Sequence, residues 1–269
     1  MKKLLIIITV FSGFASYAQE LFVFTEPASN MAANSAGIRL SNAVMKDAHT
    51  GLINYYFAPE LMVGISKNIM VHAQAFISNR EKKFIINGGS LYTKYRFFSS
   101  DEVHKHFRIA AFARYSFNNM VIHQPAIDLM DRNSGYEAGI VATQLVNKIA
   151  LSASLSALHA TDNNQNKFIY GDKNRNAISY TFSAGKLMLP KEYTSYTQTN
   201  VNLMAEFLGQ VNVGNKQIFL DIAPSIQFII NSRIRVDAGY RLALVNNLYR
   251  SSSQSAVLKL EYNFFNVIK

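Results

Sequence analysis

The sequence predicts an all-β protein, a transmembrane antiparallel β-barrel of about twelve strands, and three observations support this prediction. Apolar and polar residues alternate in one segment after another, the beginning of the chain is typical of an exported protein, and residues 254–265 form an amphipathic segment that ends in Phe264 and Phe265. Successive side chains of a strand point to opposite faces, so such a segment has one apolar and one polar face. That pattern suits a wall with lipid outside and polar groups inside.

Residues 1–18 are predicted to be a signal peptide. Lys2 and Lys3 precede an apolar stretch, and residues 16–18 (Ser-Tyr-Ala) form a small-x-small cleavage site. The apolar stretch is far shorter than the roughly 20 residues that a membrane-spanning helix needs. We therefore expect cleavage after Ala18, a periplasmic N-terminal segment at 19–35 and a barrel at 36–269.

Composition narrows the class of protein. The chain has no cysteine, which excludes a lipid-anchored lipoprotein, disulfides and thiolate metal sites. It is 49% hydrophobic, yet no window after residue 18 holds 18 consecutive apolar residues. The formal charge is +10, and in an exported protein this balance favours anionic lipid headgroups or an anionic solute over nucleic acid.

The strands are expected where alternation lies between turn signals. In order they are about 36–45, 58–66, 69–78, 84–98, 106–118, 134–147, 149–160, 177–188, 199–211, 216–230, 233–245 and 254–265. Counts of 10 or 14 are the fallback. The pattern is strongest at 216–230, where Pro224 also predicts a local bulge because proline cannot donate a ladder hydrogen bond.

Connections of different length support the same architecture. Very short turns at 68, 147–148 and 231–232 and moderate links at 99–105 and 189–198 largely alternate with more polar segments, of which 161–176 is the most hydrophilic. Outer-membrane barrels have short periplasmic turns and longer external loops. An even number of strands then places both barrel termini in the periplasm. A soluble β-barrel or sandwich is the alternative, and the signal peptide and the terminal aromatic strand count against it.

The chain resembles a family of largely uncharacterised outer-membrane β-barrel proteins of the Bacteroidetes. The resemblance rests on residues 29–42, 90–119, 133–154 and 187–210, and so spans most of the mature chain. It implies the barrel and its location, and it brings no agreed ligand or active site.

The polar faces of the strands are predicted to line the lumen. Four arginines, Arg108, Arg114, Arg235 and Arg241, would create a field that favours anions, and Asp221, Asp237 and Glu261 would limit it. One hypothesis is a narrow pore or solute-binding channel for small anionic or polar solutes. The alternative is a closed barrel, filled by a paired ionic network because unpaired charges away from water are costly. Such a barrel would anchor an envelope, secretion or efflux assembly.

Other chemistry has weak support. His104 and His106 could share a metal ion, but a His-x-His pair in a solvated turn is a weak signal, and we expect no metal and no cofactor. No Gly-x-Ser-x-Gly, His-Glu-x-x-His or phosphate-binding glycine loop is present, so an enzyme is not expected. Segment 20–35 could be a lumen- or rim-packed plug, a docking strand for a periplasmic partner or an additional strand. The expected partners are outer-membrane lipid and the outer-membrane assembly machinery, with small polar or anionic solutes and a periplasmic or envelope protein as further candidates.

Overall fold

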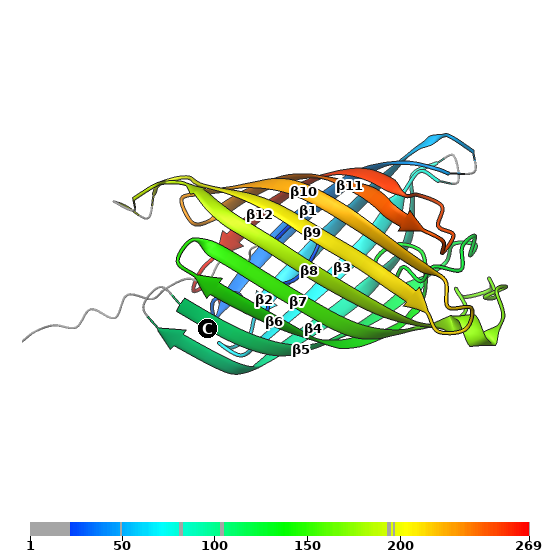
Figure 1. Cartoon of the computed structure of the whole chain (residues 1–269), viewed down its shortest axis with the longest axis horizontal. Coiled ribbons are helices and arrows are strands. Elements are labelled where there is room, and N and C mark those ends of the chain that lie inside the picture. The colour runs from blue at the N-terminus through cyan, green and yellow to red at the C-terminus, as the bar shows by residue number, and fades with distance from the viewer. Residues whose placement is uncertain are drawn as a thin grey trace, which may run out of the picture.

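A computed structural model describes residues 22–48, 50–80, 83–102, 105–192, 195 and 197–268. These residues form a closed barrel in which every strand pairs antiparallel with its two neighbours in sequence and β1 closes the ring against β12 (Figure 1). The strands are β1 (Ser35–Lys46), β2 (Ile53–Gly64), β3 (Ile69–Ser78), β4 (Ile85–Glu102), β5 (Lys105–Asn118), β6 (Gly135–Val146), β7 (Ile149–Ala160), β8 (Asn176–Leu189), β9 (Asn200–Asn212), β10 (Ile218–Ile230), β11 (Ile234–Asn246) and β12 (Gln254–Phe264). The predicted fold class and strand count are confirmed.

The alternating sequence produces a barrel with two different faces. On β10, Asp221 and Gln227 are completely buried on the lumen side, whereas Pro224 is exposed on the outside. Large apolar side chains such as Leu61, Leu155 and Leu260 are 42–53% exposed on the outer surface. A soluble core would bury these groups, so their exposure around the outside of a closed ring fits contact with lipid.

The two ends of the barrel differ. Short turns join β2 to β3, β6 to β7 and β10 to β11 at the end where β1 begins and β12 ends, and this end lies at the left of Figure 1. The opposite end carries longer connections, including residues 119–134 and 161–175, and the latter contains the four-residue 3₁₀ helix η1 (Asp172–Arg175). Within the described residues, no helix has the length and apolar character needed to cross a membrane.

Three details differ from the sequence-based expectation. β2 begins at Ile53 rather than about 58, because the aromatic residues before Ala58 pair with β1. β4 continues to Glu102 and β5 resumes at Lys105, so most of the expected link 99–105 is strand. The register shift in β10 lies at Leu220/Asp221 and not at Pro224, although Pro224 does fall in a gap of the ladder toward β11.

Candidate functional site in the barrel lumen

A row of alternating charges crosses four neighbouring strands on the lumen side. Antiparallel register places Glu60 beside Arg39, Arg39 beside Glu261 and Glu261 beside Arg235. Arg39 donates from Nε to Glu261 at 2.8 Å and from Nη1 to Glu60 at 3.1 Å. Each of these four side chains is at least 92% buried, a state that is tolerable only because opposite charges lie in contact.

A second row of polar side chains lies two residues farther along the strands, away from the barrel end where β1 begins and β12 ends. Lys259 on β12 is beside Asp237 on β11, which is beside Gln227 on β10. Asp237 also accepts a bifurcated hydrogen bond from Arg235 Nε, with Oδ2 at 2.8 Å and Oδ1 at 3.0 Å. The charges of β11 and β12 are therefore satisfied largely within the wall.

The N-terminal segment, defined here as residues 22–34, lies across the lumen. At one wall, Glu206 on β9 accepts hydrogen bonds from the backbone amides of Val23 at 2.8 Å and Phe24 at 3.0 Å. Farther around the wall, Lys94 on β4 donates to the Pro27 carbonyl at 2.7 Å, and the Ala28 amide donates to Thr143 Oγ1 on β6 at 2.9 Å. The sequence left three alternatives open for 20–35: a lumen- or rim-packed plug, a docking strand and an additional strand. The contacts of the described residues fit a segment packed in the lumen.

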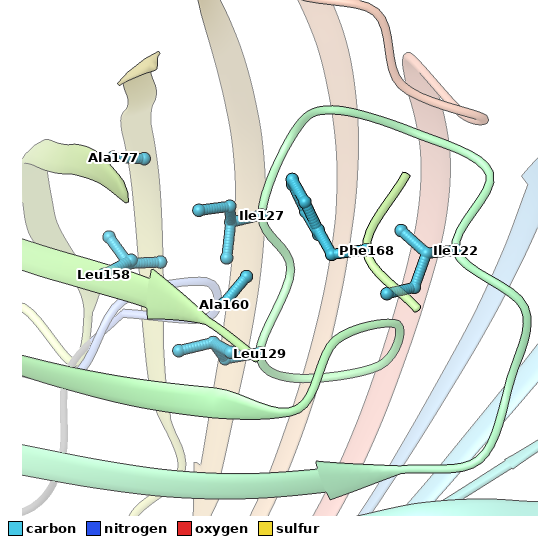
Figure 2. Packing of buried hydrophobic residues seen from close by; sticks show 7 residues of the cluster. All are labelled: Ile122, Ile127, Leu129, Leu158, Ala160, Phe168 and Ala177. Atoms are coloured by element: carbon cyan, nitrogen blue, oxygen red, sulfur yellow. The ribbon is translucent and has the colours of Figure 1, made fainter. Parts of the chain in front are cut away.

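The β5–β6 loop, residues 119–134, folds inward at the other end. The Ile127 amide donates to Gln210 Oε1 at 2.9 Å, and the Gln210 side-chain amide donates to the Ile127 carbonyl at 2.8 Å. Gln210 is a lumen-facing residue of β9, so the loop contacts the wall on the inside. Figure 2 shows Ile122, Ile127 and Leu129 of this loop packed with side chains of β7, β8 and the 161–175 loop.

A cavity of about 360 Å³ lies between these two segments. Residues 22–26 and 126–132 contribute to its two ends, and barrel side chains form the rest of its lining. The charged side chains of this lining are seven cationic ones, Arg39, Arg114, Arg132, Arg235, Arg241, Arg250 and Lys259, and five acidic ones, Glu26, Glu60, Asp128, Asp131 and Glu137. Apolar groups such as Phe24, Leu208 and Phe219 lie among them.

Two arginines share one carboxylate on the side of this cavity that is nearer the long loops. Asp221 is fully buried and accepts from Arg250 Nη1 and Nη2, each at 2.5 Å, and from Arg241 Nε. Arg250 also lies 4.1 Å from the centroid of the Phe219 ring, in cation–π contact. Because one carboxylate faces two guanidinium groups and the Arg241 side chain is 30% exposed, positive charge remains accessible in the cavity.

Arg114 lies farther around the wall. Its Nε is 3.3 Å from Glu137, and its guanidinium is 5.0 Å from the Tyr92 ring centroid. Stacking on an aromatic face and pairing with a carboxylate fix the orientation of an arginine side chain. Arg114 therefore presents a positioned charge to the cavity rather than a freely moving one.

The β5–β6 loop contains a carboxyl group with a perturbed titration. Burial raises the pKa of Asp128, and the negative charge of Asp131 raises it further. Arg132 and Arg80 act in the opposite direction, and Asp131 forms an ion pair with Arg80. The packing of this loop thus depends on charge as well as on apolar contact.

Only some of the predicted lumen residues line the cavity. Arg114, Arg235 and Arg241 line the cavity, whereas Arg108 lies near the short-turn end and contacts Asp101 at 2.9 Å and Ser29 at 3.1 Å. The acidic group Asp221, Asp237 and Glu261 lies behind the arginines, each at most 6% exposed. The sequence did not single out several charged residues of the lining. Glu26, Asp128, Asp131, Arg132 and Arg250 lie outside the strands, where alternation assigns no face. Glu137 lies on β6, where both faces are mixed in the sequence.

Of the two histidines that could share a metal ion, the structure describes only His106. His104 falls outside the described residues, and His106 Nδ1 lies 2.7 Å from Asp101 Oδ1. Among the residues that the structure does describe, no three His, Cys, Asp or Glu side chains are grouped so that they could hold a metal ion.

A closed twelve-stranded antiparallel barrel with an apolar outer face and a charged lumen has the fold of an outer-membrane β-barrel. The structure is similar to that of an outer membrane channel from Pseudomonas putida F1, with a TM-score of 0.57 and 8% identity over 90% of this chain and 100% of that chain. A structure of the NanC porin aligns with a TM-score of 0.49 and 8% identity over 84% of this chain and 98% of that chain. At these identities the first likeness shows the fold alone, and the second is too weak to carry an argument. No family model matches the chain, and no curated protein sequence matches it significantly.

Proposed function

We propose that this protein is an outer-membrane channel that takes small anionic or polar solutes into its lumen. The observation that carries this proposal is the cavity of about 360 Å³ with accessible guanidinium groups, above all Arg241. Fixed cationic groups in a narrow, partly desolvated lumen attract anions more strongly than they would in bulk water. The similar fold of a Pseudomonas putida outer membrane channel supports the proposal.

The cavity also suggests which solutes fit best. Apolar surface from Phe24, Leu208 and Phe219 lies beside the arginines, so a small organic anion can bury its carbon skeleton while its charge faces a guanidinium. The acidic residues behind the arginines limit the positive potential. This arrangement favours weak, exchangeable binding, which passage through a pore requires.

Outer-membrane lipid and the outer-membrane assembly machinery are the partners that this function implies. The signal peptide at 1–18 and membership in the Bacteroidetes barrel family remain predictions from the sequence.

A second function has its own support in the structure. The ion pairs of Arg39, Arg235 and Asp221 and the two inward-folded segments fill much of the lumen, as expected for a closed barrel that anchors an envelope, secretion or efflux assembly. A periplasmic or envelope protein would then be the main partner.

Single-channel recording distinguishes the two functions. The mature chain is refolded into a planar bilayer, and currents are measured under a salt gradient. Steady openings with a reversal potential biased toward anions are expected for the channel. Silence from the folded protein and also from a folded variant that lacks the lumen-packed residues 22–33, both shown to be folded by heat-dependent gel mobility, would instead support the anchoring role.

A further inference from the structure

The N-terminal segment makes contacts of the kind that a peptide ligand makes in a binding site. Its backbone carbonyls accept hydrogen bonds from three cationic side chains of the wall: Arg235 to Phe22 at 2.5 Å, Lys259 to Val23 at 2.5 Å and Lys94 to Pro27 at 2.7 Å. These cations come from β11, β12 and β4, so the segment is held from opposite sides of the barrel.

The amide groups of the segment are bound by a single carboxylate. Glu206 is fully buried and accepts from the amides of Val23 and Phe24 through Oε1 and from the amide and hydroxyl of Thr25 through Oε2, at 2.8–3.0 Å. Three consecutive amides directed at one anion form a concave backbone site. Phe22, immediately before them, adopts φ = 79°. That conformation is unfavourable for a residue other than glycine, so surrounding contacts must maintain it.

The wall provides space for the segment. A Cβ at Gly64 on β2 would lie 2.2 Å from the Ala32 carbonyl oxygen, and one at Gly239 on β11 would lie 2.7 Å from the Phe24 ring. The segment therefore approaches the wall closely at two places where the wall has no side chain. The site accommodates this particular path of the backbone.

Glu26 connects the segment to the row of alternating charges. Its Oε1 accepts from Arg39 at 2.8 Å, and its Oε2 lies 4.0 Å from Lys94 Nζ. Arg39 also pairs with Glu60 and Glu261, but those carboxylates belong to the wall and are at most 8% exposed. The Glu26 side chain is 24% exposed and lines the cavity, so it is the Arg39 partner that can leave with the segment.

We propose that the lumen is a binding site for an extended acidic peptide, occupied by residues 22–34 of the same chain as a reversible plug. The segment places its carbonyl oxygens and the Glu26 carboxylate against Lys94, Lys259, Arg235 and Arg39. These are cations that an anionic solute would otherwise contact, so solute and plug compete for one site. The competition between solute and plug rests on the proposed channel function. The binding of the segment in the lumen does not depend on that function.

The plug is tested by removing it and adding it back. Single-channel conductance is compared for the mature protein and for a variant that lacks residues 22–33, after heat-dependent gel mobility has shown that both are folded. The deletion is expected to raise conductance several-fold. A synthetic peptide with the sequence of residues 22–34 should then block the deletion channel, and a peptide carrying Glu26→Gln should block it less.

Point variants cover the case in which the deletion does not fold. Glu206→Gln weakens the acceptor of the segment amides, and Gly64→Ala places a methyl group against the Ala32 carbonyl. Both should increase the time spent in the open state. Asp162→Asn is the control, since Asp162 is a carboxylate of the 161–175 loop that pairs with Arg175 outside the cavity lining.

The outcomes separate this inference from the channel function. A folded deletion variant with the conductance of the parent would overturn the plug and leave the channel intact, as would equal block by a peptide of scrambled sequence. A folded deletion variant that is silent, but binds the fluorescently labelled peptide with loss of affinity on Glu26→Gln, would support the peptide site and overturn the channel.

Discussion

Asp221 and Arg250 form a two-point ion pair that fixes a loop residue to the inside of the barrel wall. Arg250 Nη1 and Nη2 lie 2.5 Å from Asp221 Oδ2 and Oδ1, and the Asp221 side chain is completely buried on β10. Arg241 of β11 contacts the same carboxylate. A loop, two strands and one side of the cavity thus depend on a single anionic group.

Asp221→Asn should therefore lower stability strongly. Removing one partner of a buried ion pair typically costs roughly 3–5 kcal/mol, because the other charge stays buried without compensation. Here two guanidinium groups would lose the charge they share. Equilibrium unfolding in lipid vesicles measures the change, with Asp172→Asn, at an exposed site in the 161–175 loop, as the control. A loss no larger than that of the control would show that water or another acceptor replaces the carboxylate.

Arg241 and Arg235 should have separable roles. The Arg241 side chain is 30% exposed in the cavity, so Arg241→Ala should move the reversal potential toward zero. The Arg235 side chain is 5% exposed and paired with Asp237 and Glu261, so Arg235→Ala should mainly lower the free energy of unfolding, by roughly 3–5 kcal/mol. Arg233→Ala removes the same charge from an exposed position in a short turn and controls for net charge. The assignment fails if Arg233→Ala changes ion selectivity as much as Arg241→Ala.

Packing of the β5–β6 loop should weaken as pH rises through the raised pKa of Asp128. Burial and the neighbouring Asp131 favour the neutral carboxyl in the folded loop. The folded pKa exceeds the unfolded value, so ionisation begins to oppose folding above the unfolded pKa, and this effect is complete above the folded one. Asp128→Asn keeps a side-chain acceptor for the Met130 amide and should remove this part of the pH dependence. Hydrogen exchange of amides 120–133, corrected for intrinsic rates, tests this. Identical pH profiles for parent and variant would contradict it.

A positive charge on the outer face should destabilise the barrel. Ile226 lies on the outward row of β10, near the middle of the strand. Lysine at the bilayer midplane of such a barrel costs about 2–4 kcal/mol, so Ile226→Lys should lower the free energy of unfolding in vesicles by a comparable amount. Gln217→Lys, just before β10 on the long-loop side, should have little effect. Equal losses would mean that Ile226 is not in the hydrocarbon region.

The order and limits of the strands were largely predictable. The predicted strands 69–78 and 149–160 have the same bounds as β3 and β7. Successive side chains of a strand point to opposite faces, so alternation of apolar and polar residues in the local sequence marks such a strand. The error at β2 has a local cause, since the aromatic sequence before Ala58 does not alternate between apolar and polar residues. These residues nevertheless form strand because they pair with β1, and the local sequence contains no sign of that pairing.

The charged face of each strand could be predicted, but not which charges meet. The sequence places Arg39, Glu261 and Arg235 on polar faces, whereas the register between strands makes Glu261 the neighbour of both arginines. For Arg39 and Glu261, that register depends on the pairing of β1 with β12, segments more than 200 residues apart in the chain. No local pattern contains that information.

By itself the sequence determined a twelve-stranded barrel with an apolar outside and a charged inside, because the two-residue repeat of a strand assigns every side chain to one face. Only the tertiary structure decided what fills the inside. The segment around Glu26 and the loop around Ile127 have no repeat that assigns a direction, and they enter the lumen because Glu206, Lys94 and Gln210 satisfy their backbone groups there. Buried backbone groups must find hydrogen-bond partners, and those partners exist only once the ring of strands has closed.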